Sequence, residues 1–172
     1  MPIIIDTNCF SNVFSRNSAK HNEFKPVLEW LISGNGMIVY GGQKYKGELK
    51  KASKFLKIFR LFKESGKVLI GNDFDIDILQ QEIDKKNNVP EFNDTHLLAI
   101  SISTKCQIIC SEDTTSIKFV TDKKYSPKGF RVPVYYTSFQ NKNLLCDKYV
   151  HKSLKPLSKM PKKIQTSLLK QI

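Results

Sequence analysis

Short apolar runs recur along this chain, and segments with helical spacing separate them. Five runs have the length of buried strands, at residues 3–5, 38–40, 67–70, 107–110 and 132–136. Helical segments lie between or beside them, at residues 8–14, 24–33, 44–67, 76–85 and 93–103. Strands that alternate with helices are typical of right-handed crossovers in a parallel sheet. The sequence therefore predicts an α/β fold with a Rossmann-like, mainly parallel sheet that helices cover on both faces.

An acid follows the first of these strands directly, in the stretch IIIDTN at residues 3–8. In open parallel sheets, ligands bind just beyond the carboxyl ends of the strands. Asp6 is therefore expected at the edge where chemistry takes place, although Asp6 or Thr7 could instead cap the next helix. Asp113 follows the fourth strand in IICSED, so we expect Asp6 and Asp113 at the same edge.

Two further acids are candidates for the same edge. Asp94 stands at the start of the segment 93–103, which is almost wholly apolar, so that only its first turn can meet solvent. Successive steps of four, three and four residues lead from Glu48 to Ala52, Phe55 and Phe59 in the helical segment 44–67, which predicts that Glu48 faces inward. A simpler alternative exists for each: Asp94 and Glu48 could favour a helix N-terminus, and Asp113 could start a turn.

The chain is strongly basic. Its 172 residues fit one domain, and it carries a net charge of +12 with a pI near 9.5. This charge favours a polyanionic partner such as nucleic acid, the alternative being a well solvated surface. Because no apolar run is long enough to span a membrane and no secretory signal precedes the first strand, we expect no membrane partner and a cytoplasmic location.

The basic residues are concentrated in two segments. The segment 44–67 combines nine basic residues and two acids with apolar residues at helical spacing, which predicts one amphipathic helix with a cationic outer face. Its candidate nucleic-acid contacts are Lys44, Lys46, Lys50, Lys54 and Lys57. The segment 142–172 holds eight lysines and one acid, and two prolines interrupt it. A basic arm at residues 141–172, loosely ordered or built of short helical pieces, is therefore predicted after a domain at residues 1–140.

Four stretches of this sequence resemble, in order, the four blocks of the PIN-domain nucleases: IIIDTNCF, YGGQKYKGEL, NDTHLLAIS and CSED. The resemblance covers about residues 2–139. It implies that Asp6, Glu48, Asp94 and Asp113 form a catalytic, metal-binding quartet and that Asn8 and Ser111 support it. The basic arm and the segment DFDIDILQQEIDKK have no counterpart in the family pattern.

The resemblance and the chemistry of the acids agree on a function. Phosphodiester hydrolysis needs charge neutralisation and a water activated near neutral pH, both of which Mg²⁺ or Mn²⁺ held by carboxylates provides. We therefore expect a metal-dependent endoribonuclease. Its target RNA stays open. The resemblance also implies a toxin of a toxin–antitoxin or defence system, with an antitoxin, another protein or a second copy as partner. The main alternative is a non-catalytic, PIN-like RNA-binding or scaffold module.

Other residues suggest sites that we interpret as structural. His96 is two residues from Asp94, which on a helix means opposite sides, so a surface or packing role is favoured over a general base. The acids at positions 73, 75 and 77 resemble the start of a calcium loop, but Ile78 and Asp84 stand where that loop needs Gly and Glu. Tyr40, Tyr45 and Phe92 could stack on bases, although a core role is favoured. The cysteines lack zinc-site spacing and are expected to be reduced and mostly buried: Cys9, Cys106, Cys110 and Cys146.

Overall fold

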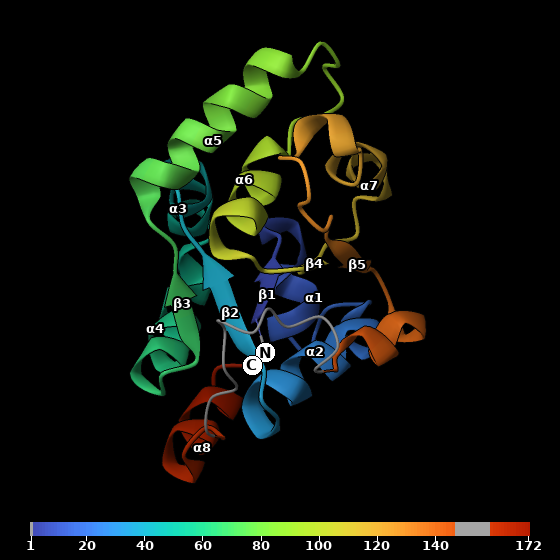
Figure 1. The fold of residues 1–172 in the computed structure, drawn as a ribbon. Helices are drawn as coiled ribbons and strands as arrows, with labels where there is room; N and C mark the ends of the chain where they lie inside the picture. The colour runs from blue at the N-terminus through green and yellow to red at the C-terminus, as the bar shows by residue number, and fades with distance from the viewer. Residues whose placement is uncertain (1, 147–158) are drawn as a thin grey trace.

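A computed structural model describes residues 2–146 and 159–172 and contains a five-stranded parallel sheet (Figure 1). The strands lie in the order β3-β2-β1-β4-β5. Their bounds are Pro2–Ile5 for β1, Met37–Tyr40 for β2, Val68–Ile70 for β3, Ile108–Cys110 for β4 and Val134–Tyr136 for β5. Every neighbouring pair is parallel, so the predicted α/β, Rossmann-like architecture is confirmed.

The strand order reverses beside β1. The chain first adds β2 and β3 on one side of β1 and then adds β4 and β5 on the other. Crossovers that leave a central strand in opposite directions open a crevice beyond its carboxyl end, and this switch point is where ligands bind in open α/β sheets. The fold therefore predicts a ligand-binding site at the carboxyl ends of β1 and β4.

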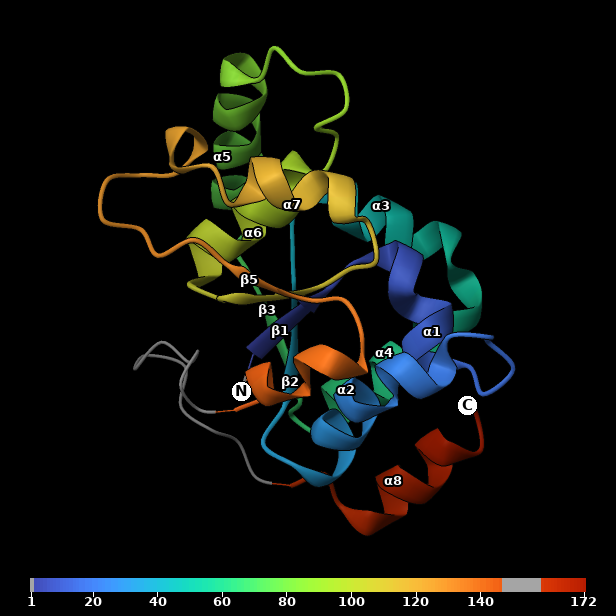
Figure 2. The same cartoon turned by 90° about the vertical axis from the view of Figure 1, so that its right-hand side faces the viewer.

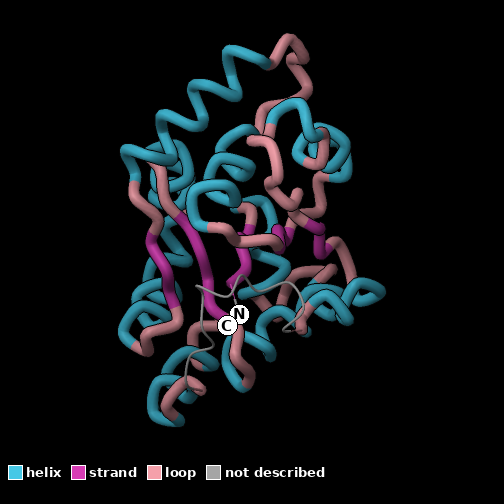
Figure 3. Tube along the Cα trace, in the orientation of Figure 1, coloured by secondary structure: helices cyan, strands magenta, loops and turns pink. Residues whose placement is uncertain are grey.

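Helices cover both faces of the sheet. Figure 2 shows α5 (Asp73–Lys86), α6 (Thr95–Thr104) and α7 (Thr114–Val120) on one side. On the other side lie α1 (Phe10–Phe14), α2 (His21–Ser33), α4 (Leu56–Glu64) and α8 (Lys162–Leu169). The helix α3 (Gln43–Lys51) follows β2. Three short 3-10 helices are η1 (Thr7–Cys9), η2 (Ser53–Phe55) and η3 (Lys123–Tyr125), and a longer one is η4 (Phe139–Leu144). Figure 3 shows how short the strands are beside these helices.

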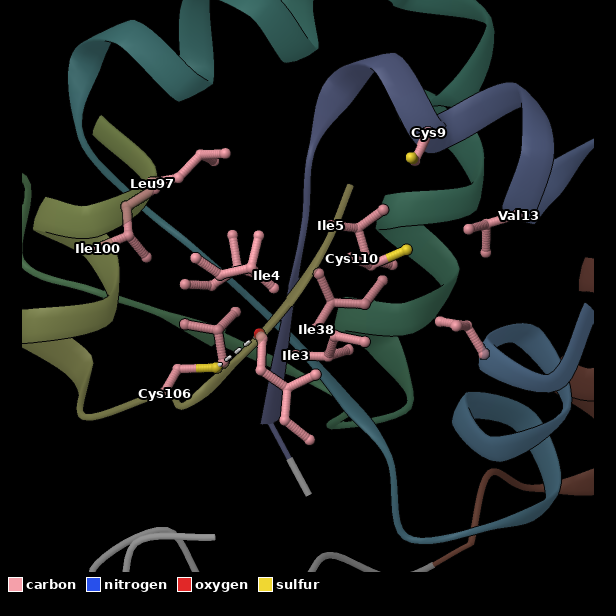
Figure 4. Packing of buried hydrophobic residues seen from close by; sticks show 14 of the residues in the cluster. Ile3, Ile4, Ile5, Cys9, Val13, Ile38, Leu97, Ile100, Cys106 and Cys110 are labelled. Atoms are coloured by element: carbon pink, nitrogen blue, oxygen red, sulfur yellow. Dashed lines mark hydrogen bonds between the residues drawn. The ribbon is translucent and has the colours of Figure 1, made fainter. Parts of the chain in front are cut away.

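The central strand β1 is buried on both faces. Ile3, Ile4 and Ile5 have no exposed surface. Because side chains alternate along a strand, Ile4 points toward Leu97 and Ile100 of α6, whereas Ile5 points to the opposite side (Figure 4). Burying an isoleucine side chain fully contributes roughly 1.5–3 kcal/mol, so this strand anchors the sheet. All four cysteines are free and three are buried, as the sequence predicted.

The basic segment 44–67 is not one helix, so that prediction is wrong. The helix α3 ends where Ala52 leaves the helical region, with φ −81° and ψ 46°, and α4 begins only after η2. The break lets Phe55 and Phe59 pack on Phe10 of α1, with ring centroids 5.6 and 5.0 Å apart. Aromatic packing thus overrides the helical periodicity.

The last basic residue of that segment is not on the cationic surface either. Lys67 is fully buried, and its Nζ donates hydrogen bonds to the carbonyl oxygens of Gly34, at 2.8 Å, and Gly36, at 2.9 Å. Burial lowers the pKa of Lys67. The lysine therefore ties the α2–β2 connection to the start of β3.

The described end of the predicted basic arm packs on the domain. The helix α8 contacts α4, and Leu168 is fully buried. The backbone N–H of Arg16 donates to the carbonyl of Ile172 at 3.4 Å. Lys148, Lys152, Lys155 and Pro156 lie outside the described residues. Among the helices of residues 2–146 and 159–172, none is both long and apolar enough to cross a membrane.

Candidate functional site

Asp6 joins the carboxyl ends of β1 and β4. Its backbone N–H donates to the carbonyl of Cys110 at 2.9 Å, which continues the pairing of the two strands. Its side chain accepts a 2.7 Å hydrogen bond from Ser111 Oγ and a 3.3 Å bond from the N–H of Asn8. Burial raises the pKa of Asp6 to about 6, with the Ser111 bond opposing this and the charge of Asp94 reinforcing it.

Asp94 lies at the start of α6, and its charge acts on Asp6. It occupies the position before the first helical residue, yet its side chain makes no capping hydrogen bond. Asp94 therefore stands at the helix N-terminus without the hydrogen bond of a side-chain cap. Burial raises its pKa, the neighbouring His96 lowers it, and the charge of Asp113 raises it further. Asp94 thus interacts electrostatically with Asp6 and with Asp113.

Asp113 combines a structural and a site position. Its Oδ1 accepts a 2.8 Å hydrogen bond from the N–H of Thr115 and caps α7. Its own N–H donates to Ser111 Oγ at 3.1 Å, and Ser111 in turn donates to Asp6. Asp6 likewise caps η1. The cap interpretation is therefore confirmed for Asp6, and Asp113 caps a helix where the start of a turn was the alternative, while the site interpretation of both stays a prediction.

Glu48 enters the site from α3. Its Oε2 accepts a 3.0 Å hydrogen bond from Thr7 Oγ1 and lies 3.5 Å from His96 Nε2. Burial raises the pKa of Glu48, but contacts with His96 and Thr7 and the charge of Lys44 outweigh it, so the net shift is downward. Glu48 therefore differs from Asp6 and Asp94, because its surroundings favour the ionised form.

A surface position for His96 is wrong, because the side chain is buried, whereas a packing position agrees with the structure. The expected placement of His96 and Asp94 on opposite sides does not hold, because the two side chains interact. Asp94 has φ −93° and ψ 28° and precedes the helix, so helical spacing does not separate the two side chains. His96 is 2% exposed; its Nε2 faces Glu48 Oε2 at 3.5 Å, and its Nδ1 has no hydrogen-bond partner in the described part of the chain. The same holds for the buried hydroxyl of Tyr135.

Tyr135 was not singled out by the sequence. Burial raises the pKa of its hydroxyl, and the charges of Asp94, Asp6 and Asp113 add to that rise, which locates the hydroxyl among the acids. A tyrosine inside a β5 strand has no sequence pattern that distinguishes it from a core residue. Its position beside the site follows only from the strand order.

The predicted supporting residues have unequal roles. Ser111 is fully buried and bonds both Asp6 and the N–H of Asp113, as a supporting residue should. Asn8 is exposed, and its backbone N–H, not its side chain, makes the contact with Asp6. Thr7 makes the side-chain contact expected of Asn8. The 3-10 turn η1 turns Thr7 toward Glu48 and the next residue toward solvent.

Two acids of α5 hold the helix that carries Glu48. Asp73 Oδ1 accepts a 2.9 Å hydrogen bond from the N–H of Gly42, and Asp77 Oδ1 accepts one of 2.9 Å from the N–H of Gln43. Asp73 also pairs with Lys46. These acids thus satisfy the first N–H groups of α3 from a neighbouring helix. This explains the acidic DFDID segment without a calcium site.

The five candidate RNA-binding lysines have different surroundings. Lys50 and Lys57 are exposed. Lys54 lies 4.8 Å from the centroid of the Phe55 ring and donates a 3.4 Å hydrogen bond to Ser11 Oγ. Lys46 is in the ion pair with Asp73, and Lys44 Nζ donates to the carbonyl of Asn93. The charge of Lys44 acts on Glu48 and Asp94, and the side chains of Lys50 and Lys57 are exposed to solvent.

The chemistry of the donors fits a hard divalent cation, although the acids are not gathered into a closed cage. Within residues 2–146 and 159–172, no three His, Cys, Asp or Glu side chains are placed to hold one metal ion. Mg²⁺ usually binds through one or two carboxylates and retains several waters. The unpartnered hydroxyl of Tyr135 and imidazole of His96 are suitable partners for such waters.

No protein-family model, curated protein or solved structure matches this chain. The function is therefore inferred from the geometry of the site and from the chemistry of its residues. The site combines four carboxylates, three hydroxyls and one imidazole at the switch point of a parallel sheet.

Proposed function

We propose that this protein is a Mg²⁺- or Mn²⁺-dependent endoribonuclease whose site is built on Asp6, Glu48, Asp94 and Asp113. The observation that carries the proposal is the gathering of three acids at the β1/β4 crevice: Ser111 Oγ bonds both the Asp6 carboxylate and the N–H of Asp113, and Asp94 interacts with both acids. Like charges in a partly buried site destabilise the metal-free fold. A cation would relieve this repulsion, so the arrangement is understandable if a cation belongs to the working site.

The proposed reaction is hydrolysis of one phosphodiester bond. A divalent cation at this site would neutralise charge on the phosphate and lower the pKa of a water. Asp6 and Asp94 are the proposed direct ligands, while Ser111 and Thr7 orient Asp6 and Glu48. Attack of the water oxygen on phosphorus forms a P–O bond and breaks the bond to the 3′ oxygen, which takes up a proton. The products are a 5′ phosphate and a 3′ hydroxyl.

The surroundings of the site support RNA as the substrate. The chain carries a net charge of +12, although four acids gather at the crevice and two more cap α3. Lys44 borders the acids, and Lys50 and Lys57 extend the basic surface along α3 and α4. Phosphates flanking the bond to be cut would bind these ammonium groups without sequence preference.

The second candidate is a non-catalytic RNA-binding or scaffold module of PIN-like architecture. The absence of three close metal-binding side chains in the described part favours it. The contacts of Ser111 with Asp6, and of Thr7 and His96 with Glu48, favour the enzyme, because a scaffold has no need of carboxylates gathered and oriented at one sheet edge.

Cleavage of labelled single-stranded RNA by the purified protein separates the two functions. The enzyme predicts cleavage that requires Mg²⁺ or Mn²⁺, stops in excess EDTA and falls by orders of magnitude in Asp94→Asn. The module predicts RNA binding without cleavage under all these conditions. Glu91→Gln, which removes an exposed carboxylate from the loop before Asp94, is the matched control and should cleave like the parent.

We also propose a toxin role in the cytoplasm, held inactive by an antitoxin, on the strength of the family resemblance. Growth arrest on expression should then depend on Asp94, and a small protein encoded beside this gene should relieve it. Arrest that persists in Asp94→Asn would contradict the toxin role.

A further inference from the structure

The strand β3 forms an open edge of the sheet. Among the described residues it pairs with β2 alone, and in Figure 1 it is the outermost strand, between α4 and the start of α5. At the opposite edge, Tyr135 and Tyr136 of β5 are buried, whereas Ile70 of β3 is 39% exposed. An edge strand with exposed apolar side chains is a template for pairing with another strand.

The hydrogen bonds with β2 determine which backbone groups of β3 face outward. The carbonyl of Lys67 accepts from an N–H of β2, and the N–H of Gly71 donates to a carbonyl of β2, both at 2.9 Å. The backbone groups of successive residues point to alternate sides of a strand. The N–H and C=O groups of Val68 and Ile70 are therefore directed away from β2.

The spacing of these outward groups is self-complementary. In an antiparallel ladder, two opposite residues of a hydrogen-bonded pair exchange both N–H···O=C bonds, and such pairs alternate with non-hydrogen-bonded pairs. If two copies of β3 pair about a twofold axis at Leu69, Val68 of each copy lies opposite Ile70 of the other. Every outward N–H and C=O group of both residues then gains a partner. Because Val68 and Ile70 project to the same face of the strand, each exposed Ile70 covers a Val68.

Exposed apolar side chains of α5 extend this edge. Three residues of β3 are too few to hold two chains by backbone bonds alone. Phe74, which is 71% exposed, and Ile78 follow Ile70 in the chain and lie one turn apart on the same side of α5. These three residues are half of the six exposed large hydrophobic residues in the described part of the chain. Phe74 and Ile78 have no part in capping α3, which uses Asp73 and Asp77.

The charges at the two ends of β3 favour a second copy of this chain as the occupant. The last turn of α4, before β3, contains the exposed Lys63, while Glu64 is paired with Arg60. The first turn of α5, after β3, contains the exposed Asp75. Antiparallel pairing brings the basic end of one copy and the acidic end of the other to the same end of the paired strands. RNA fits this edge poorly, because the acids of α5 repel phosphate.

We propose that two copies of this chain associate through β3 about a twofold axis at Leu69, so that their two sheets become one continuous sheet. Phe74 and Ile78 of each copy pack on the other beside the paired strands. Antiparallel pairing directs the carboxyl ends of the two sheets in opposite directions, so the two acid crevices act on separate RNA molecules. The contact uses none of the acids of the proposed nuclease site, so it forms whether or not the protein cleaves RNA.

The mass of the purified full chain, free of nucleic acid, tests the association. Sedimentation equilibrium should show a reversible rise to twice the 19.8 kDa of the chain as the protein concentration increases. Phe74→Ser should raise the dissociation constant of the dimer by about tenfold or more, because the ring no longer buries its surface. Phe139→Ser removes a ring of η4 that is 46% exposed and should leave the constant unchanged. A chain that stays monomeric at its highest soluble concentration, or equal constants in all three proteins, overturns the proposal.

Disulfide cross-linking tests the register. The two residues at the twofold axis form a non-hydrogen-bonded pair with Cα atoms about 4.5 Å apart, which is within the range of a disulfide. Oxidised glutathione should therefore cross-link two copies of Leu69→Cys. Ile70→Cys carries a more exposed thiol, but it lies opposite Val68, so its two thiols are too far apart and should stay reduced. The parent, whose described cysteines are free, gives the background. Equal cross-linking of the two variants, or cross-linking of Ile70→Cys alone, overturns the proposal.

A backbone substitution separates strand pairing from a purely side-chain contact. Ile70→Pro removes an outward N–H group and leaves the bonds to β2 intact, since proline is tolerated where an edge strand faces solvent. It should raise the dissociation constant of the dimer. A twofold contact also closes on itself, so association should stop at two copies. Masses above twice that of the chain would show a head-to-tail contact and would overturn the proposal.

Discussion

Ser111 Oγ donates a 2.7 Å hydrogen bond to Asp6 Oδ2 and so joins two residues 105 positions apart in the chain. Ser111 follows the carboxyl end of β4 and Asp6 follows that of β1, and the strand order reverses between these two neighbouring strands. The bond orients the most buried acid of the site and opposes the rise in its pKa that burial causes. The bond thus holds Asp6 and Ser111 together at the point where the strand order reverses.

The first prediction concerns the pH dependence of stability in the metal-free protein. Burial raises the pKa of Asp6 from 3.8 to about 6. Between these values the unfolded chain releases its proton first, so the free energy of unfolding falls as pH rises from 4 to 6 and stays low above 6. The shift corresponds to at most about 3 kcal/mol.

The Asp6→Asn variant should lack this fall in the free energy of unfolding between pH 4 and 6. Urea unfolding in EDTA should give the variant a free energy of unfolding above that of the parent at pH 7, with a much smaller difference at pH 4. Glu91→Gln, which removes an exposed acid, should follow the parent. A parent whose stability does not fall between pH 4 and 6 would show that Asp6 is not a strained acid.

Divalent metal should stabilise the parent more than the site variants. Binding to the folded state alone raises the free energy of unfolding by about 2.7 kcal/mol when free metal is roughly 100 times its Kd. Thermal unfolding with and without Mg²⁺ should give a larger rise in Tm for the parent than for Asp6→Asn or Asp94→Asn. Glu91→Gln is the control and should match the parent. Equal rises in all four proteins would rule out these aspartates as ligands.

The support of α3 by α5 can be tested with two acids from the same helical turn. Asp73→Ala removes the acceptor for the N–H of Gly42 and the partner of Lys46, and loss of such a cap costs about 1–2 kcal/mol. Asp75 is exposed, and within the described residues no hydrogen bond or ion pair joins its side chain to α3, so Asp75→Ala should cost less than about 0.5 kcal/mol. Urea unfolding measures both, and equal losses would mean that the contact with α3 contributes nothing.

The basic surface should contribute affinity that depends on salt. On single strands, each phosphate contact adds about 0.7 to the slope of log K against log salt. Lys50→Gln and Lys57→Gln should therefore lower the slope for RNA binding without changing metal-dependent cleavage of short substrates. Lys25→Gln, a lysine of α2 paired with Glu29, should leave the slope unchanged. Slopes that do not differ between these variants would place the RNA elsewhere.

Residues after Lys142 are better tested by substitution than by truncation. Leu168 and Met160 are buried, so deleting this end would expose the surface that they cover. Glutamine at Lys159, Lys162 and Lys163 removes charge and keeps the packing. Binding that becomes weaker and less salt-dependent would show that this end contacts RNA, and unchanged binding would show that its role is structural.

The sequence predicted the frame of the site because strand ends are local signals. An apolar run that stops at Asp6 or just before Ser111 marks the carboxyl edge of a parallel sheet, whatever the rest of the chain does. The apolar helix after Asp94 likewise predicts burial. These features depend on the identity of neighbouring residues, so they could be read without coordinates.

Features that depend on contacts between residues distant in the chain could not be predicted from the sequence. The break between α3 and α4 follows from Phe55 packing on Phe10, and periodicity alone favours a continuous helix. The site position of His96 depends on the non-helical backbone of Asp94, and that of Tyr135 on the neighbouring strand β4. The caps on α3 join Asp73 and Asp77 to a helix 31 and 34 residues away.

The chemical ends of the RNA products test the central claim most directly. Hydrolysis at a carboxylate-held metal leaves a 5′ phosphate and a 3′ hydroxyl, whereas attack by the 2′ hydroxyl of the RNA leaves a 2′,3′-cyclic phosphate. We predict that fragments made by the parent with Mg²⁺ can be extended by a polymerase at the 3′ end and ligated at the 5′ end without prior treatment. Asp94→Asn prepared in the same way should yield no such fragments. Cyclic phosphate ends, or identical fragments from Asp94→Asn or in excess chelator, would contradict the account.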